Sequence, residues 1–176
     1  MATIEVPPDH WTVDTMPDAE DVGLELVDGA LLVTPPERIG NSVVASRLVA
    51  VLARAAGSER DVIAHGGVYF DQHNYREPDV VVCRRLPRGA ARLDARDVEL
   101  AVEVLSPSSL LNDRVAKPAQ YAAAGIPHYW LLDPDAPSLV AHELHDGGYR
   151  VAARFDDVVA VQRPVAVTFS LDELLA

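Results

Sequence analysis

The chain has 176 residues, 49% of them hydrophobic and 24% charged, and a formal net charge of −12 at pH 7. This length fits a single domain with a substantial core, and no apolar run approaches the ~20 residues that a membrane-spanning helix requires. The N-terminus lacks a basic stretch followed by an apolar one, so we expect no signal peptide. The single cysteine, Cys83, excludes an internal disulfide and a cysteine-based zinc site, and we expect a reducing cytoplasm as the compartment.

The first structured elements are predicted to be a hairpin and a long helix. Asp28-Gly29 lies between two short apolar runs and supplies the positive φ angles of a two-residue hairpin turn. From Arg38 to about Ala56 the apolar residues recur at helical spacing, which predicts an amphipathic helix. Gly57 is suited to end that helix.

Four segments after this helix have the composition of strands. They read, in chain order, DVIAH, GVYF, DVVVC and DVELAVEVL. The last two are almost continuously apolar, which is typical of strands covered on both faces. We expect Cys83, at the end of the third segment, to be a buried strand residue.

A second helix is predicted from about Asp113 to Ala124, ending at the Gly125-Ile126-Pro127 stretch. Proline removes a backbone N–H and is tolerated only in the first turn of a helix. Pro118 therefore predicts either a start near Val115 or a kink.

The C-terminal third is predicted to be mostly strands. HYWLLDP has the pattern of a strand, and residues 138–154 form a hairpin that turns at residues 146–148. The terminal SLDELLA predicts a helical turn with Ser170 as its N-cap and Glu173 three residues on. The elements together predict an α/β (α+β) fold, a mixed β-sheet flanked by helices. We expect an irregular arm over residues 1–20 and one domain over residues 21–176.

Two acidic residues stand in the apolar strand segments: Asp79 opens DVVVC, and Glu103 lies within LAVEVL. A buried carboxylate is costly unless a proton, a cation or a metal compensates it. Mg²⁺ prefers oxygen ligands and usually takes one or two protein carboxylates. If the two strands are neighbours, Asp79 and Glu103 are suited to bind Mg²⁺, joined by a backbone oxygen of Val104 or Leu105. Lys117, one loop later, would then orient the attacking water and stabilise negative charge, which is the chemistry of phosphodiester hydrolysis.

Each of these residues also has a structural interpretation. Asp79 would be a solvated turn residue, Glu103 an outward-facing residue on an exposed strand, and Lys117 a solvated helix lysine. Asp113 either caps the second helix or pairs with Lys117 at the i, i+4 spacing. Tyr121, one turn after Lys117, favours packing over catalysis.

Four segments carry a resemblance to a known family: ELVDGALLVTPP, EPDVVV, LAVEVLSPSS and DRVAKPAQYAAAGIPHYWLLDP. They resemble the putative restriction endonuclease family, formerly a domain of unknown function, of the PD-(D/E)XK nuclease superfamily, over roughly residues 20–170. The resemblance implies a restriction-endonuclease-like core that binds Mg²⁺ or Mn²⁺ and cleaves DNA. It makes Asp79 the aspartate of the PD half and Glu103 the second acidic residue.

The chain departs from the pattern of this family at two positions. Leu105 stands two residues after the second acid, where the superfamily carries its lysine, so Lys117 would have to reach back from the following helix. Asn41 stands where family members often have a histidine near the start of the first long helix. Glu25 holds the place of a recurring family glutamate. We expect Glu25, Asn41 and Asp113 in the outer shell of the metal.

The charge argues against binding of duplex DNA, because proteins that hold DNA usually carry a basic face. Six arginines around Asp79 nevertheless suggest a local basic patch: Arg76, Arg84, Arg85, Arg88, Arg92 and Arg96.

The leading hypothesis is a cytoplasmic, metal-dependent DNA endonuclease that acts as a homodimer, since cutting both strands takes two active sites. The alternatives are a catalytically weak or inactive DNA-binding or regulatory domain on the same fold, and a protein-interaction module. Other chemistries lack their motifs. The histidines form no HExxH pair, the serines lack a GxSxG setting, and no P-loop or GxGxxG run occurs.

Overall fold

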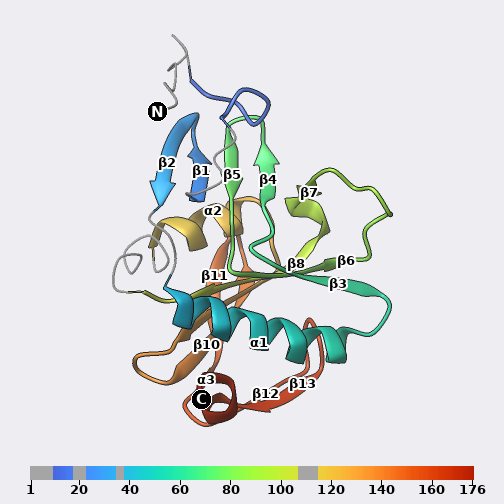
Figure 1. The fold of residues 1–176 in the computed structure, drawn as a ribbon, viewed down its shortest axis with the longest axis vertical. Helices are drawn as coiled ribbons and strands as arrows, with labels where there is room; N and C mark the ends of the chain where they lie inside the picture. The colour runs from blue at the N-terminus through green and yellow to red at the C-terminus, as the bar shows by residue number, and fades with distance from the viewer. Residues whose placement is uncertain (1–9, 18–22, 35–37, 107–114) are drawn as a thin grey trace.

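The computed structural model describes residues 10–17, 23–34, 38–106 and 115–176. The strands are β1 (Gly23–Val27), β2 (Ala30–Thr34), β3 (Arg60–Ala64), β4 (Val68–Asp71), β5 (Asn74–Arg76), β6 (Val80–Arg84), β7 (Leu93–Asp94), β8 (Val98–Val104), β9 (His128–Asp133), β10 (Ser138–His145), β11 (Gly148–Phe155), β12 (Val158–Val161) and β13 (Val167–Ser170). The helices are α1 (Ile39–Ala56), the short 3₁₀ turn η1 (Ala95–Asp97), α2 (Lys117–Ala123) and α3 (Leu171–Leu175). The strands form three sheets, in the orders β2-β1-β5-β4-β7, β11-β10-β9-β8-β6-β3 and β12-β13 (Figure 1).

The first sheet begins with the predicted hairpin. Strands β1 and β2 pair antiparallel with Val27 opposite Ala30. Asp28 and Gly29 turn the chain with φ angles of 49° and 78°, the two positive values that a tight hairpin turn needs. The prediction from Asp-Gly is therefore confirmed. The Trp11 amide donates to the Gly29 carbonyl at 2.9 Å, so part of the N-terminal segment packs against this turn. The division between an arm and a domain stays a prediction.

The central six-stranded sheet is mixed: β8 runs parallel to β9 and antiparallel to β6. Residues Val80 to Cys83 of β6 are fully buried, and all of β8 except Glu99 is buried. The two apolar segments are thus covered on both faces, as predicted. Burial raises the pKa of the Cys83 thiol to about 11, so this group is protonated at neutral pH.

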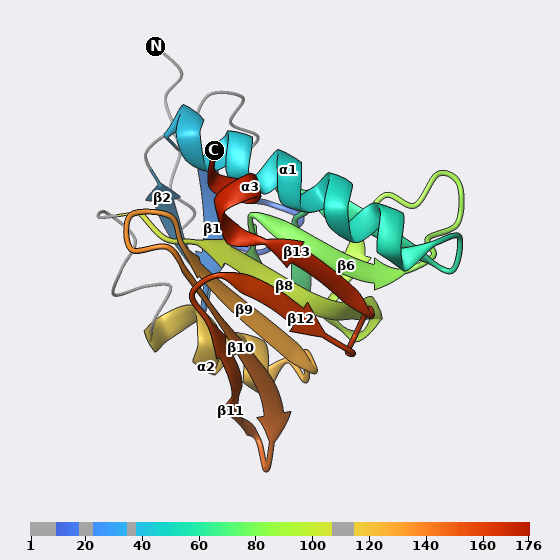
Figure 2. The same ribbon diagram turned by 90° about the horizontal axis from the view of Figure 1, so that it is seen from below.

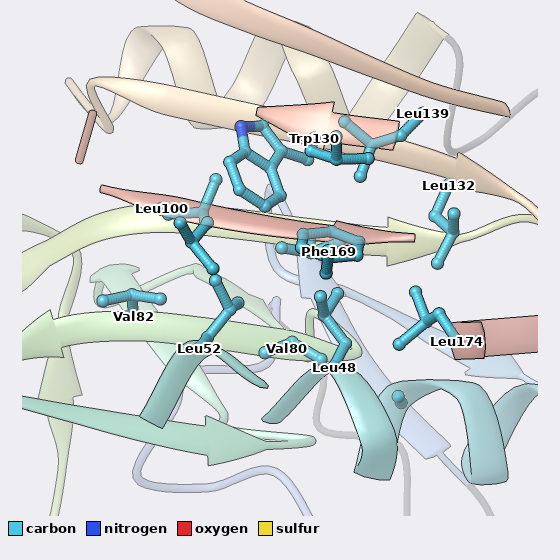
Figure 3. Packing of buried hydrophobic residues seen from close by; sticks show 14 of the residues in the cluster. Leu48, Leu52, Val80, Val82, Leu100, Trp130, Leu132, Leu139, Phe169 and Leu174 are labelled. Atoms are coloured by element: carbon cyan, nitrogen blue, oxygen red, sulfur yellow. The ribbon is translucent and has the colours of Figure 1, made fainter. Parts of the chain in front are cut away.

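Helix α1 covers one face of the central sheet. Leu48 and Leu52 of this helix lie in one apolar cluster with Val80, Leu100 and Trp130 of the sheet (Figure 3). The β12–β13 pair and α3 contribute to the same cluster. Helix α2 lies on the opposite face (Figure 2), over a second apolar cluster of buried residues. The predicted fold class, a mixed sheet flanked by helices, is confirmed.

The first long helix runs from Ile39 to Ala56, and Gly57 follows it with a φ of 66°, as predicted. Its length of 18 residues and mean hydropathy of 1.3 would suffice for a membrane span by composition. By mean hydropathy, α1 therefore meets the criterion for a membrane-spanning helix, although polar residues interrupt its apolar runs. A core helix meets the same criterion, and the inner face of α1, including Leu48 and Leu52, is buried on the sheet.

Helix α2 begins at Lys117, with Pro118 in its first turn. The missing N–H of proline is tolerated there, because the first-turn amides of a helix have no partner within the helix. Asp113, the predicted start, lies outside the described residues. At the C-terminus, α3 follows Ser170 as predicted, but the Ser170 side chain makes no capping hydrogen bond. The predicted capping box is therefore wrong.

Candidate active site

Asp79 directly precedes β6, and Glu103 is the next-to-last residue of the neighbouring strand β8. The antiparallel register places Val80 opposite Val102, which brings Asp79 beside the last residues of β8. One oxygen of Asp79, Oδ2, accepts a hydrogen bond from the Val104 amide at 2.5 Å. Glu103 is only 1% exposed, so it is not an outward-facing residue on an open strand. The two strands are neighbours, which was the condition for a shared metal site.

Helix α2 provides two donors to the Glu103 carboxylate. Lys117 Nζ lies 2.8 Å from Oε2, and the Tyr121 hydroxyl donates to Oε1 at 2.6 Å. Residues four apart share a helix face, so both donors project from α2 toward β8. Lys117 is 7% exposed and thus does not point to solvent. Burial, followed by the nearby Glu103 charge, raises the pKa of Tyr121 well above its ordinary value, so its hydroxyl remains a donor.

Lys117 is the only lysine among the 15 lysine and arginine residues of the chain. Lysine presents a compact, mobile charge, whereas the arginine guanidinium is planar and always protonated. Lys117 is thus the one position among the 15 lysine and arginine residues that carries an ammonium group, and it is buried beside a carboxylate. This compositional signal was present in the sequence and would have singled out residue 117.

A second ion pair lies next to this one. Glu25 of β1 and Arg76 of β5 are each 2% exposed, and Arg76 Nη1 lies 2.5 Å from Glu25 Oε2. Lys117 Nζ is 3.6 Å from the other Glu25 oxygen, and Arg76 Nε donates to Gln120 Oε1 at 2.7 Å. Glu25, Arg76, Lys117 and Glu103 therefore form a buried cluster with two charges of each sign, which offsets the cost of burying them. We refer to these four residues as the charge cluster.

The predicted basic patch around Asp79 is wrong for most of its members. Arg76 is buried in the charge cluster. Three more are paired with carboxylates: Arg85 with Asp61, Arg92 with Asp14, and Arg96 with Asp94. Sequence proximity to Asp79 did not reveal these partners, because Asp14 and Asp61 come from segments far away along the chain. An arginine with an adjacent carboxylate contributes little to a positive field.

Asn41 reaches the site from the start of α1. It is buried, and its Nδ2 donates to the carbonyl oxygens of Val104 at 3.4 Å and Leu105 at 3.2 Å. These are the two backbone oxygens that were predicted as further metal ligands. Asn41 therefore holds the chain that leaves β8, a role that needs an amide and no base. The other outer-shell candidate, Asp113, lies outside the described residues.

The donor groups fit a hard divalent cation. Asp79 and Glu103 carry carboxylate oxygens, and the carbonyls of Val104 and Leu105 follow Glu103 directly along the chain; these are the kinds of oxygen ligand that Mg²⁺ takes. Within the described ranges, no three or more histidine, cysteine, aspartate or glutamate side chains are arranged to hold a metal.

Replacing Tyr121 by phenylalanine tests the bond to Glu103. Y121F removes only a hydroxyl that donates to a buried carboxylate, and hydrogen bonds to charged groups contribute about 1.5–3 kcal/mol. We expect the free energy of unfolding, measured in urea, to fall by that amount. The matched control is Y149F, which removes a hydroxyl that donates to the neutral Ile126 carbonyl and should cost about 1 kcal/mol. Equal losses in the two variants would contradict a special role for Tyr121.

Replacing Arg76 by methionine tests the charge cluster. R76M leaves Glu25 buried without its closest cation, and breaking a buried pair costs about 3–5 kcal/mol. The comparison is R85M, which breaks the exposed pair with Asp61 and should cost about 1 kcal/mol or less. Urea denaturation of both variants measures these losses in the free energy of unfolding. The interpretation fails if R76M is no less stable than R85M.

The fold and this site define the class: a restriction-endonuclease-like core with two acidic residues and a lysine at the edge of its central strands. The chain belongs to the Uma2 family, described as "putative restriction endonuclease", whose model matches residues 12–173. A crystal structure of a "putative nuclease belonging to DUF820" from Anabaena variabilis is similar, with 20% sequence identity and a TM-score of 0.73. The similarity covers 93% of this chain and 97% of that one, and it shows a common fold. A comparison with curated proteins gives no match.

Proposed function

We propose that this protein is a metal-dependent endodeoxyribonuclease that hydrolyses phosphodiester bonds in DNA. The observation that carries the proposal is the convergence of Asp79, Glu103 and Lys117, with Lys117 Nζ 2.8 Å from Glu103. The description of the family as restriction endonucleases supports nuclease activity in general. Asp79 and Glu103 would hold Mg²⁺ or Mn²⁺. The bound ion would supply positive charge at the phosphate and lower the pKa of the attacking water.

The protein groups then have separate tasks. The Val104 amide fixes Asp79, and the Tyr121 hydroxyl fixes Glu103, so both carboxylates are oriented before substrate arrives. Lys117 holds its ammonium protons at the same carboxylate, from which it can donate to the attacking water or to a phosphate oxygen. Glu25 and Arg76 position Lys117 from behind. Asn41 keeps the Val104 and Leu105 carbonyls in place.

Cleavage of supercoiled plasmid tests the proposal directly. We expect nicked and linear products with Mg²⁺ or Mn²⁺ and none with EDTA, because the metal supplies the charge at the phosphate. Single-stranded DNA and RNA of the same sequence define the substrate class. If no metal supports cleavage but DNA still binds, the protein is a DNA-binding or regulatory domain. If neither metal nor DNA binds, it is a protein-interaction module.

We also propose that the protein works as a homodimer in the cytoplasm. Cleavage of both strands of a duplex takes two active sites, and twofold dimers are the commonest assemblies. A single cysteine cannot form an internal disulfide, which fits a reducing compartment. Light scattering after size-exclusion chromatography should give twice the 19.0 kDa of one chain. A mass of one chain at working concentrations, in a preparation that cleaves both strands, would contradict the dimer.

A further inference from the structure

A cavity of about 580 Å³ lies beside the candidate active site, between α2 and strands β9, β10 and β11. Leu105 and Pro118 line it, and these residues directly follow Val104 and Lys117 of the site. Its volume is within the range of ~300–1,000 Å³ that is typical of small-molecule sites. The cavity therefore adjoins the site and shares Leu105 with it, but Asp79, Glu103 and Lys117 do not line it.

One wall of this cavity is aromatic. Tyr129, His142 and Tyr149 line it, with the Tyr129 and Tyr149 ring centroids 5.6 Å apart and their planes at 27°. The rings are fixed by polar contacts: the Tyr149 hydroxyl donates to the Ile126 carbonyl at 2.7 Å, and His142 Nδ1 lies 3.2 Å from the Tyr129 carbonyl. Burial lowers the pKa of His142 below its ordinary value, so this wall is uncharged at neutral pH.

The same cavity has polar groups on three adjacent strands. Asp133 on β9 is opposite Ser138 on β10, and Arg154 on β11 is opposite Val140 on β10. Arg154 is exposed and presents a guanidinium, the group best suited to a phosphate. Asp133 is anchored, since its Oδ1 accepts the amides of Asp135 and Ala136. The cavity thus combines an aromatic wall with one guanidinium, one carboxylate and a hydroxyl.

We propose that this cavity is a nucleotide subsite, which takes one base of a single strand against the aromatic wall and the phosphate of that nucleotide on Arg154. The inference rests on the proposed function, since the phosphate to be cleaved would lie next to it, at Asp79 and Glu103. Proteins that bind single strands combine aromatic stacking surfaces with cationic groups in this way. A purely apolar ligand would leave Arg154 and Ser138 unused, and a simple anion would leave the wall unused.

Two substitutions test the subsite: one narrows the cavity, and the other removes its cation. Ala119 is exposed on α2 and lines the cavity, so A119F fills space without removing a core contact. R154Q removes the guanidinium. The probe is a short fluorescein-labelled oligothymidylate, with binding followed by fluorescence anisotropy in Ca²⁺. We expect A119F to bind about tenfold more weakly than wild type, the usual scale for loss of one stacked base. R154Q should also bind about tenfold more weakly, because it loses a charged hydrogen bond to the phosphate.

The matched controls leave the cavity intact. A123F places the same side chain on an exposed α2 position that does not line the cavity, and R150Q removes another exposed arginine of β11. Both should bind the oligothymidylate like wild type. Deoxythymidine monophosphate serves as a competitor. If deoxythymidine monophosphate displaces the probe from wild type but does not bind A119F, the cavity is a site for free nucleotides as well. If the monophosphate does not displace the probe, the cavity binds a nucleotide only as part of a strand.

The subsite is overturned if wild type does not bind the probe, or if A119F and R154Q bind it as tightly as the controls. Urea denaturation checks that the variants fold. If A119F does not fold, the comparison of R154Q with R150Q is the test. The two proposals fail separately. Loss of affinity in both variants of a protein that never cleaves DNA retains the subsite and rejects the nuclease. Cleavage by a protein whose variants bind normally retains the nuclease and rejects the subsite.

Discussion

Glu103→Gln is expected to lower the rate of DNA cleavage by about a thousandfold or more. The substitution keeps the size of the side chain and removes the negative charge that would hold the metal, and each 1.4 kcal/mol lost from the transition state is tenfold in rate. Lys117 and Tyr121 of α2 hold the two oxygens of Glu103 in a fixed orientation, which the neutral amide of glutamine does not reproduce. Plasmid nicking gives the rate, and isothermal titration with Mn²⁺ gives the metal affinity.

The same substitution should destabilise the metal-free protein. Glu103→Gln removes the carboxylate at 2.8 Å from Lys117 Nζ and leaves the one of Glu25 at 3.6 Å, so the charge cluster becomes positive. The control is Glu99→Gln on the same strand, where the carboxylate pairs with Arg60 at 2.7 Å and is partly exposed. Glu99→Gln should keep both metal binding and cleavage. If Glu103→Gln binds Mn²⁺ with the affinity of wild type, Glu103 is not a metal ligand.

Lys117→Met is expected to lower cleavage by about a hundredfold to a thousandfold while metal binding persists. Removing one group that stabilises charge in a transition state costs about this much. The metal should bind at least as tightly as in wild type, because the ammonium that lies 2.8 Å from Glu103 is a cation competing for the same carboxylate. A decrease in cleavage without a decrease in metal affinity separates the role of Lys117 from that of Glu103.

Stability measurements give this prediction a second readout. Without Lys117, the charge cluster holds two carboxylates and one cation, so the metal-free variant should unfold at a lower temperature than wild type. A divalent ion that binds only the folded state stabilises it, and Mg²⁺ should therefore raise the melting temperature of Lys117→Met more than that of wild type. Arg54→Met, which removes an exposed cation from α1, should show neither effect. An unchanged Mg²⁺ response in Lys117→Met would show that Lys117 and the metal do not share Glu103.

The elements that the sequence predicted well are those whose signal is local. The Asp28-Gly29 turn, the helix ending at Gly57 and the apolar runs of β6 and β8 each follow from residues within a few positions of one another. The four strands that the pattern did not predict are β5, β7, β12 and β13. They have two to four residues each, too few to show a period, and they form because a partner strand lies beside them.

The site residues divide in the same way, into those with a local sequence signal and those whose contacts depend on packing. Two carboxylates inside apolar strands identify Asp79 and Glu103 as candidates from the sequence, because burial of such a group is costly without a partner. The partners themselves are set by packing. Arg76 belongs by sequence to a run of surface arginines, and only the pairing of β1 with β5 buries it against Glu25. Tyr121 has the pattern of a packing residue, and only the approach of α2 to β8 turns its hydroxyl toward Glu103.

The sequence by itself determined the fold class, the main strands and helices, and the pair of acidic residues on the strands. The tertiary structure alone decided that Lys117 faces Glu103, since a lysine fourteen residues away in the chain is as free to face water as to face a carboxylate. It also decided that the two cations and two carboxylates of the charge cluster neutralise one another. Local sequence patterns indicate which buried charges need a partner. Which residue becomes that partner depends on which distant segments of the chain pack together.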